Sequence, residues 1–266
     1  MFSILKLSKK MKTGMFFTDF CRAFFSLKFI LALIGTISVL FVTLIDNISC
    51  RSDVVSVFFL VEFSNFSLMI LITSAYAYAD AICEDIEHKY ISQIVVRNNR
   101  VNYVFSKVIT IFLSAFVCTV IAYVVYSYLL RLRMPWFTSD STSEFLLQTK
   151  MYDSLIKRRL YPLYFMALGI RKGMLAGVFA VFASYFSLYV KSKTFVLATP
   201  FFGYYFLDSI LSSLLRYPLL KMAYSGNEMM FSSEVVSLFA SFVLTVLALI
   251  ILFWLINKKI KTEYFT

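Results

Sequence analysis

Six long apolar stretches follow one another along this chain of 266 residues. They cover about residues 29–45, 54–79, 104–130, 166–190, 195–215 and 235–256. A membrane helix needs about 20 apolar residues to cross the hydrocarbon core, because each residue advances the helix by ~1.5 Å. The apolar runs are continuous and do not alternate with polar residues, so helices are favoured over the strands of a barrel. The sequence therefore predicts an all-α integral membrane protein with six transmembrane helices, forming a single transmembrane domain over residues 1–266.

The composition favours lipid over water as the surroundings of this chain. Hydrophobic residues make up 60% of it and charged residues 15%, against about 25% charged residues in soluble domains. A soluble fold could not bury so much apolar surface, whereas lipid accepts it. The net charge of +11 comes from short clusters of Lys and Arg between the apolar runs. This arrangement favours contact with anionic membrane lipids and argues against nucleic acid as a partner.

The distribution of Lys and Arg predicts that both termini lie in the cytoplasm. Cytoplasmic segments of membrane proteins carry the excess of these residues. Here they gather in the N-terminal tail, in the connection near residues 80–107, in a turn between the fourth and fifth spans, and after the last span. Residues 1–28 are accordingly expected to form a cytoplasmic tail and an interfacial helix, with Asp19 on the polar side of that helix. Residues 131–165 are expected to form an extracytoplasmic insertion.

The connection between the second and third spans, about residues 80–103, is too long and too structured for a simple turn. Its apolar residues recur at helical spacing, as at Ile82, Ile86 and Ile94. Acidic residues stand at its start and basic residues at its end, which suits the dipole of a helix. The pattern predicts a short amphipathic helix presented to the cytoplasm. The residues alone also allow a solvated, charged loop that only follows the topology rules.

Several charged residues and one tyrosine of this connection and of the following span occur in a characteristic order. It runs Glu87, Lys89, a short helical stretch, Arg97, Arg100, Tyr103 and Lys107. This order resembles the cytoplasmic loop between the first two core spans of type-2 ABC exporter permeases, which are membrane subunits with six helices per chain. The resemblance extends to the interfacial N-terminal helix, the six spans and the polar segment between the last two spans.

The resemblance implies that the connection contains a coupling helix. Such a helix sits in a groove of a separate ATPase subunit and converts closure of that subunit into movement of the spans. The residues implied to make this contact are Glu84, Asp85, Glu87, Lys89, Arg97 and Arg100. The resemblance also implies a second permease chain, an amphiphilic cargo (an antimicrobial peptide, a drug or a lipid) and a location in the plasma membrane of a bacterium.

The chain offers no motif for catalysis. None of its seven glycines belongs to a G-x-x-x-x-G-K-[ST] phosphate loop, so ATP and Mg²⁺ are expected on the partner subunit. The four cysteines are far apart and His88 is the only histidine, so neither a metal site nor a redox pair is expected. We therefore expect a permease that is not an enzyme and that holds no cofactor of its own.

Two acidic residues, Glu62 and Asp208, lie within the expected spans. A charge at the middle of the bilayer costs at least ~2.5 kcal/mol and normally faces a partner or water. The two carboxylates either line the transport path, pair with Lys or Arg near the outer surface, or sit in the outer headgroup zone. In an alternative function, an ATP-independent secondary carrier or channel, they would bind the coupling ion. A membrane sensor or assembly factor that transports nothing is a third alternative.

Glycines repeat on one face of the fourth expected span. Gly169, Gly173 and Gly177 form two successive Gly-xxx-Gly steps, which allow another helix to approach the backbone closely. The approaching helix belongs either to the same chain or to a second copy. In the fifth span, Pro200 and Gly203 are expected to produce a bend.

Overall fold

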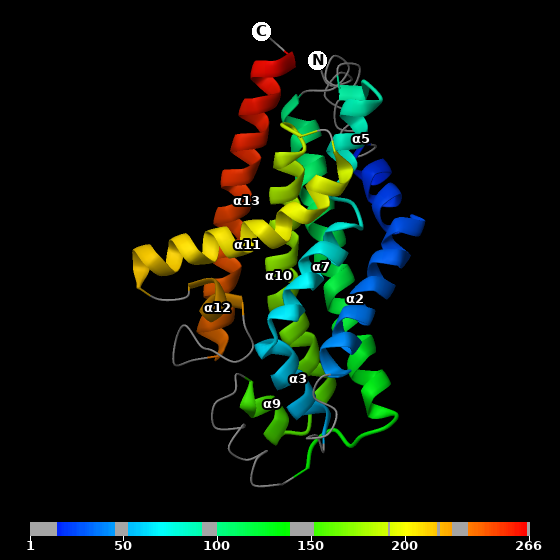
Figure 1. The fold of residues 1–266 in the computed structure, drawn as a ribbon, viewed down its shortest axis with the longest axis vertical. Coiled ribbons are helices and arrows are strands. Elements are labelled where there is room, and N and C mark those ends of the chain that lie inside the picture. The colour runs from blue at the N-terminus through cyan, green and yellow to red at the C-terminus, as the bar shows by residue number, and fades with distance from the viewer. Residues whose placement is uncertain are drawn as a thin grey trace, which may run out of the picture.

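The computed structural model describes residues 15–45, 53–91, 100–138, 152–190, 192–216, 219–224 and 234–264. All regular secondary structure in these ranges is helical. Figure 1 shows long helices running side by side along the molecule, with the start of the first described helix and the end of the last one toward the same end. The all-α fold predicted from the sequence is confirmed for this part of the chain.

A leading helix, Met15–Phe24, opens the described chain. The elements that follow are α2 (Leu27–Ile45), α3 (Val54–Phe63), the 3₁₀ helix η2 (Asn65–Met69), α4 (Ile70–Ala75), α5 (Ala81–Glu87), α7 (Arg100–Arg131), α9 (Asp153–Lys157), α10 (Tyr161–Phe186), α11 (Lys193–Leu215), α12 (Leu219–Tyr224) and α13 (Glu234–Tyr264). Four single helices, α7, α10, α11 and α13, are long and apolar enough to cross a membrane. Two bent helix pairs raise the number of candidate spans in the described residues to six if each pair is counted as one span.

The first bent pair joins the leading helix to α2 at an angle of 48°. At the bend, the Ser26 hydroxyl donates to the Ala23 carbonyl oxygen, and its Oγ accepts from the Phe29 N–H. One serine therefore satisfies backbone groups of both helices. The expectation for the polar side of this helix is corrected, because Asp19 is only 5% exposed and faces the interior of the molecule instead of water.

The second expected span, residues 54–79, is not one straight helix. The chain turns by 81° between α3 and α4. Ser64 stands at the turn with an extended backbone; its N–H donates to the carbonyl oxygens of Leu60 and Val61, and its Oγ accepts from the Phe66 N–H. Serine side chains compete for backbone hydrogen bonds in this way, and such competition ends helices. The second candidate span is therefore a bent pair and not the continuous helix expected from hydropathy.

The helices α7 and α10 make the most extensive contact of the fold, and the repeated glycines of α10 lie at this contact. A Cβ added to Gly177 would lie 2.5 Å from Phe112 Cδ2, and one added to Gly173 would lie 3.0 Å from Phe116 Cδ2. An added Cβ on Gly169 would meet α7 in the same way. The missing side chains let the two backbones approach closely. Of the two alternatives for this face, the structure places a helix of the same chain against it.

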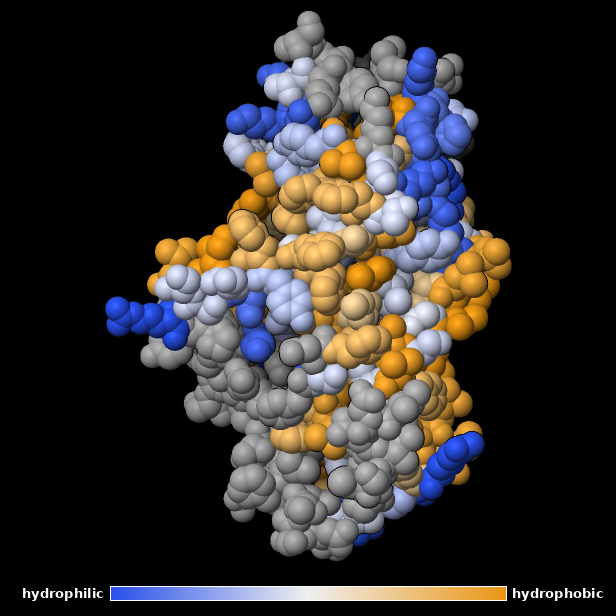
Figure 2. Space-filling view, in the orientation of Figure 1, coloured by the Kyte–Doolittle hydropathy of each residue, from blue (hydrophilic) through white to orange (hydrophobic). Residues whose placement is uncertain are grey.

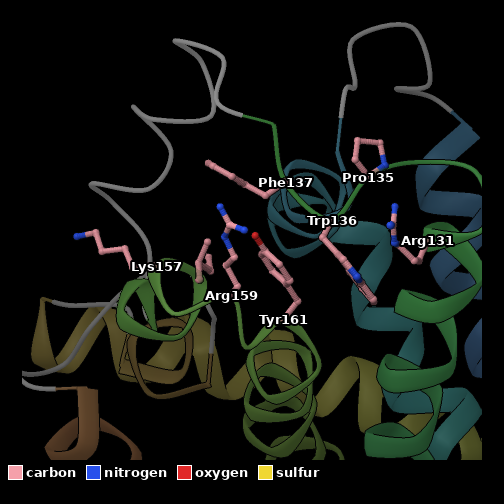
Figure 3. A pocket seen from close by; sticks show the side chains of 8 residues that line it. Arg131, Pro135, Trp136, Phe137, Lys157, Arg159 and Tyr161 are labelled. Carbon is pink, nitrogen blue, oxygen red and sulfur yellow. The ribbon is translucent and has the colours of Figure 1, made fainter.

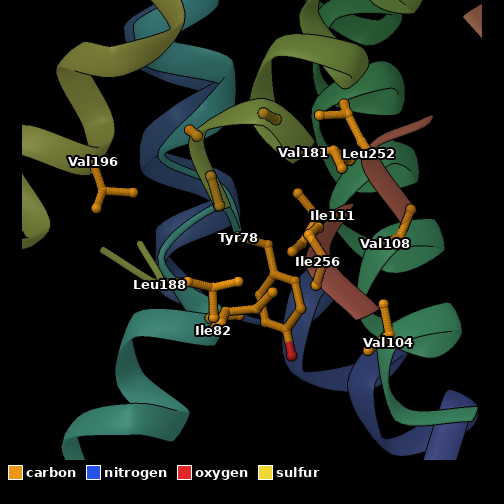
Figure 4. Packing of buried hydrophobic residues seen from close by; sticks show 14 of the residues in the cluster. Tyr78, Ile82, Val104, Val108, Ile111, Val181, Leu188, Val196, Leu252 and Ile256 are labelled. Atoms are coloured by element: carbon orange, nitrogen blue, oxygen red, sulfur yellow. The ribbon is translucent and has the colours of Figure 1, made fainter. Parts of the chain in front are cut away.

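A core of buried apolar residues holds α5 against the long helices. It contains Ile82 of α5, Val104 of α7, Val181 of α10 and Ile256 of α13, whose side chains converge in Figure 4. Within lipid, close packing of side chains rather than exclusion of water holds helices together. The core therefore places α5 at the point where three long helices meet.

The helix α11 lies across the other long helices instead of parallel to them (Figure 1). Pro200 stands inside it, where a proline removes a backbone donor and bends a helix. Gly203 allows a close approach to α10, because an added Cβ would lie 2.6 Å from Phe182 Cε1. Phe206 and Leu214 farther along α11 are 66% and 74% exposed. The expected fifth span thus has the composition of a span but a direction different from the others.

The surface agrees with a membrane environment. Figure 2 shows hydrophobic side chains over most of the middle of the molecule on the face in view, with much of the hydrophilic surface toward the end that carries α5. On α13, Phe239, Ile250 and Trp254 are all more than half exposed. Apolar side chains exposed all along a long helix are expected where the helix faces lipid. The described part of the chain is therefore compatible with a multi-pass membrane protein.

Candidate functional site

The short helix α5 and the residue that precedes it carry four carboxylates, and each of them pairs with a lysine from another helix. The pairs and their N···O distances are Lys28–Asp80 (2.7 Å), Lys28–Glu84 (2.6 Å), Lys107–Asp85 (2.8 Å) and Lys193–Glu87 (2.7 Å). Lys28 belongs to α2, Lys107 to α7 and Lys193 to α11. Ion pairs therefore attach this one short helix to three long helices.

The innermost of these lysines, Lys107, lies in a buried group of charges. Its side chain is 1% exposed, and its Nζ contacts Asp19 Oδ1 at 3.0 Å as well as Asp85. Two hydroxyls supply further donors, since Tyr103 donates to Asp85 Oδ2 at 2.8 Å and Ser106 donates to Asp19 Oδ2 at 2.7 Å. Buried carboxylates need such partners, because burial of an unpaired charge is costly.

Two further side chains complete this group. Tyr78 donates to Asp19 Oδ1 at 3.3 Å and accepts from Lys107 Nζ at 3.4 Å. Arg22, which is half exposed, reaches Asp85 Oδ1 at 3.8 Å. We call the whole set the Lys107 cluster; it consists of Asp19, Arg22, Tyr78, Asp85, Tyr103, Ser106 and Lys107. Its two carboxylates and two cations balance in formal charge, and they join the leading helix, α5 and α7.

Glu84 and Glu87 lie at the more exposed side of α5. Burial acts to raise the pKa of Glu84, but the hydrogen bond and the charge of Lys28 outweigh it and bring this pKa below its ordinary value. The hydrogen bond from Lys193 lowers the pKa of Glu87. Both carboxylates are therefore ionised at neutral pH and attract their lysines.

The residues that the resemblance assigned to ATPase contact differ in how much of each side chain is exposed. Asp85 has a side-chain exposure of 2% and binds within the chain. Glu84 and Glu87 are paired but keep 24% and 46% of their side chains exposed. Lys89 is exposed and has a left-handed backbone, with φ of 56°. Arg97 lies outside the described residues.

The remaining residue of that set, Arg100, begins α7 and donates from Nε to Asn257 Oδ1 of α13 at 2.8 Å. The expected amphipathic helix corresponds in its first half to α5, which ends at Glu87. The left-handed Lys89 follows, and this conformation is a common helix terminator. Residues 92–99, the second half of the expected helix, lie outside the described part of the chain.

The two acidic residues expected within spans have different surroundings. The side chain of Glu62 is only 3% exposed; its Oε2 lies 3.3 Å from Lys172 Nζ of α10, and Tyr123 donates to its Oε1 at 2.8 Å. Asp208 of α11 is partly buried, and its Oδ1 has no hydrogen-bond partner among the described residues. Of the alternatives for Glu62, the structure favours pairing with a lysine.

Sequence reasoning did not identify which lysines bind these carboxylates. Lys107 and Lys172 lie inside the third and fourth expected spans, and a charge inside a span normally has a buried partner, so this signal could have identified them. Lys28 and Lys193 stand at span ends, where lysine is common and carries no such signal. Asp19 was assigned to an exposed polar side, because helical periodicity does not show whether a polar face meets water or a buried lysine.

No group of three or more His, Cys, Asp and Glu side chains is placed to hold a metal ion within the described ranges. A scan against protein-family models and searches among curated proteins and solved structures found no match to this chain. The geometry of α5 and its ion pairs is therefore the observation from which a function is proposed below.

Proposed function

We propose that this chain is the membrane-spanning permease subunit of an ATP-driven ABC exporter and that a separate ATPase subunit moves its spans through α5. The observation that supports this proposal is the attachment of α5 to α2, α7 and α11 by four ion pairs. A coupling element must be held firmly to several spans, so that a displacement at one end of the molecule reaches all of them.

In the proposed mechanism, the partly exposed carboxylates of Glu84 and Glu87 and the exposed Lys89 offer charged groups to the ATPase subunit. Closure of that subunit would displace α5. Asp85 and Lys107 would then carry the displacement into α7, because separating two buried charges costs several kcal/mol and the two helices move as one unit. Lys28 and Lys193 would pass it to α2 and α11.

Other parts of the proposed transporter lie outside this chain. The ATPase subunit would bind ATP and Mg²⁺, and a second permease chain, identical or related, would complete the transport path. We propose six spans with both termini in the cytoplasm, in the plasma membrane of a bacterium. The cargo would be amphiphilic, an antimicrobial peptide, a drug or a lipid, which suits the aromatic content of 18%.

Co-purification from native membranes in a mild detergent tests the proposal. We expect a soluble ATP-hydrolysing protein to accompany the chain in stoichiometric amount. Reversing two charges together, Glu87→Lys and Arg97→Glu, should release it, whereas Arg158→Glu at the opposite end of the molecule should not. Transport by liposomes that contain only this chain, without nucleotide, would overturn the proposal.

Glu87 also binds Lys193 within the chain. Loss of the ATPase from the reversed variant could therefore result from the broken ion pair between α5 and α11 instead of from a lost contact with the ATPase. Adding Lys193→Glu to the reversed variant gives a swapped variant, which rebuilds the internal pair with opposite polarity and keeps Arg97→Glu in both proteins. If the swapped variant folds as the parent does and still lacks the ATPase, the reversed charges contact the partner directly. If the ATPase returns, the contribution of Glu87 is to hold α5 to α11.

A second candidate function, an ATP-independent secondary carrier, is favoured by the pair of Glu62 and Lys172. A buried carboxylate in a candidate span that exchanges its lysine for a proton or a cation could couple transport to an ion gradient. In that case Glu62→Gln should abolish ion-driven uptake by liposomes that contain this chain alone. The permease proposal instead expects no uptake by such liposomes with either glutamate or glutamine at this position.

A further inference from the structure

A pocket of about 560 Å³ opens at the end of the molecule opposite α5, where α7 ends and α10 begins. Its lining residues come from the end of α7, from the chain at residues 135–137, from α9 and from the start of α10, and Figure 3 shows them from close by. Because α7 and α10 are both candidate membrane spans, their ends place the pocket at a membrane surface, at the height of lipid headgroups.

Among the described residues that line this pocket, every charged side chain is positive. Arg131, Lys157 and Arg159 line it, and none of its described lining residues is acidic. In Figure 3, Arg159 lies in the middle, between Lys157 on one side and Trp136 on the other, with Arg131 beyond Trp136. Cations gathered around a concave surface raise the local concentration of anions.

Aromatic rings form the apolar part of the pocket. The rings of Trp136 and Tyr161 are stacked, with centroids 5.8 Å apart and planes inclined by 10°. The Arg131 guanidinium lies 5.8 Å from the centroid of the Trp136 ring. Cations beside large rings suit a ligand that has an anionic group and an adjoining apolar part.

Arg159 has a backbone conformation that is unfavourable for arginine. Its φ is 59°, in the left-handed region that glycine adopts most readily. Its N–H donates to the Ile156 carbonyl oxygen at 2.9 Å, which closes the turn after α9. Its side chain has no hydrogen bond or ion pair within the part of the chain that the structure describes. A guanidinium that is kept at such a position and lines a pocket, with no partner among the described residues, indicates a ligand from outside the chain.

We propose that this pocket binds the phosphate group of an anionic membrane amphiphile such as an anionic phospholipid. Arg159 and Arg131 would bind the phosphate oxygens, because a guanidinium presents paired N–H donors that match them. The apolar part next to the phosphate would lie against Trp136 and Tyr161. This site is separate from α5 and its function does not depend on an ATPase.

Trp136 makes the site measurable by fluorescence, because the chain has only two tryptophans. The other, Trp254, is 58% exposed on α13, and Trp254→Phe leaves Trp136 as the only tryptophan, which can be excited selectively over the tyrosines. The test titrates the full chain, purified in dodecyl maltoside, with short-chain phosphatidylglycerol. We expect a saturable change in Trp136 emission, and much weaker binding of short-chain phosphatidylcholine, whose headgroup has no net charge.

Two variants assign the effect to Arg159. Arg159→Gln should raise the apparent Kd for phosphatidylglycerol about tenfold or more, because it removes a charged donor. Arg158→Gln is the matched control, since Arg158 is the adjacent exposed cation and does not line the pocket. Arg159→Gly should also lose binding, yet unfold at the same temperature as the parent or higher, because glycine relieves the backbone. Loss of the site is thereby distinguished from loss of the fold.

Inorganic phosphate tests the source of the phosphate group. It should displace phosphatidylglycerol, but only at much higher concentration, because it lacks the apolar part. If inorganic phosphate saturates the Trp136 signal as tightly as the lipid does, the assignment to an amphiphile is overturned. Equal affinities for phosphatidylglycerol and phosphatidylcholine, or an unchanged Kd in Arg159→Gln, overturn the phosphate site itself.

Discussion

Lys107 of α7 contacts Asp85 of α5 at 2.8 Å, and both side chains are almost completely buried, at 1% and 2% exposure. This ion pair connects a short helix to a long candidate span. Asp19 of the leading helix binds the same ammonium group at 3.0 Å. Because an unpaired charge at such depth costs several kcal/mol, the three groups keep their three helices together.

Replacing Lys107 by methionine should destabilise the protein strongly. The change removes the ammonium group that Asp19 and Asp85 share. The two buried carboxylates then keep mainly hydrogen bonds from hydroxyl groups. We expect the free energy of unfolding to fall by about 3–5 kcal/mol, measured by denaturant titration of the purified protein in detergent. Lys261→Met, at an exposed position of α13, is the control and should change it by less than about 0.5 kcal/mol.

The three charged groups that meet at Lys107 can also be replaced together by uncharged ones. Adding Asp19→Asn and Asp85→Asn to Lys107→Met removes the uncompensated negative charge, so a substantial part of the lost stability should return. A triple variant that is less stable than Lys107→Met alone would show that the cluster is held by its hydrogen-bond geometry and not by charge balance.

The pair of Lys28 and Glu84 should make stability depend on pH. Lys28 lowers the pKa of Glu84 in the folded protein, whereas in the unfolded chain this pKa is about 4.3. The contribution of the pair is therefore complete above about pH 4.3 and is lost as the pH falls through the lower folded value. The difference in unfolding temperature between the parent and Glu84→Gln should be constant near neutral pH and shrink in acid. A difference that stays the same down to about pH 3 would contradict this.

Alanine at Gly177 should disturb the contact between α7 and α10. Its Cβ would lie 2.5 Å from Phe112 Cδ2 and 3.0 Å from the Phe112 carbonyl oxygen, so the helices must move apart. We expect the free energy of unfolding to fall by about 1–3 kcal/mol. Gly35→Ala is the matched control, because its Cβ would lie 3.5 Å from Thr73 Cγ2, an ordinary contact. That variant should be neutral or up to about 1 kcal/mol more stable.

The buried pair of Glu62 and Lys172 can be tested with a double-mutant cycle. Glu62→Gln and Lys172→Met should each reduce the free energy of unfolding, because each leaves the other group without its partner. The double variant should be more stable than the sum of the two effects predicts, with a coupling energy of about 1–3 kcal/mol. Additive effects would mean that the 3.3 Å contact contributes nothing to stability.

Hydropathy was sufficient to find the long helices, because it is a property of each segment alone. The apolar run at 104–130 became α7, and the run at 235–256 lies within α13. The glycine spacing of α10 likewise predicted a close contact with another helix, although it did not identify that helix as α7. Hydropathy and residue spacing predict such helices because they depend on one segment alone and not on how the helices pack.

Tertiary structure decided the direction of helices and the partner of each charge. Hydropathy did not reveal the 81° turn at Ser64, because two short apolar helices and one long one have the same composition. It also did not show that Asp19 faces Lys107 or that Glu62 faces Lys172. Those contacts join residues 88 and 110 positions apart, as Lys107 follows Asp19 and Lys172 follows Glu62. They depend on how each helix is rotated about its axis, and only the packing of all the helices together determines that rotation.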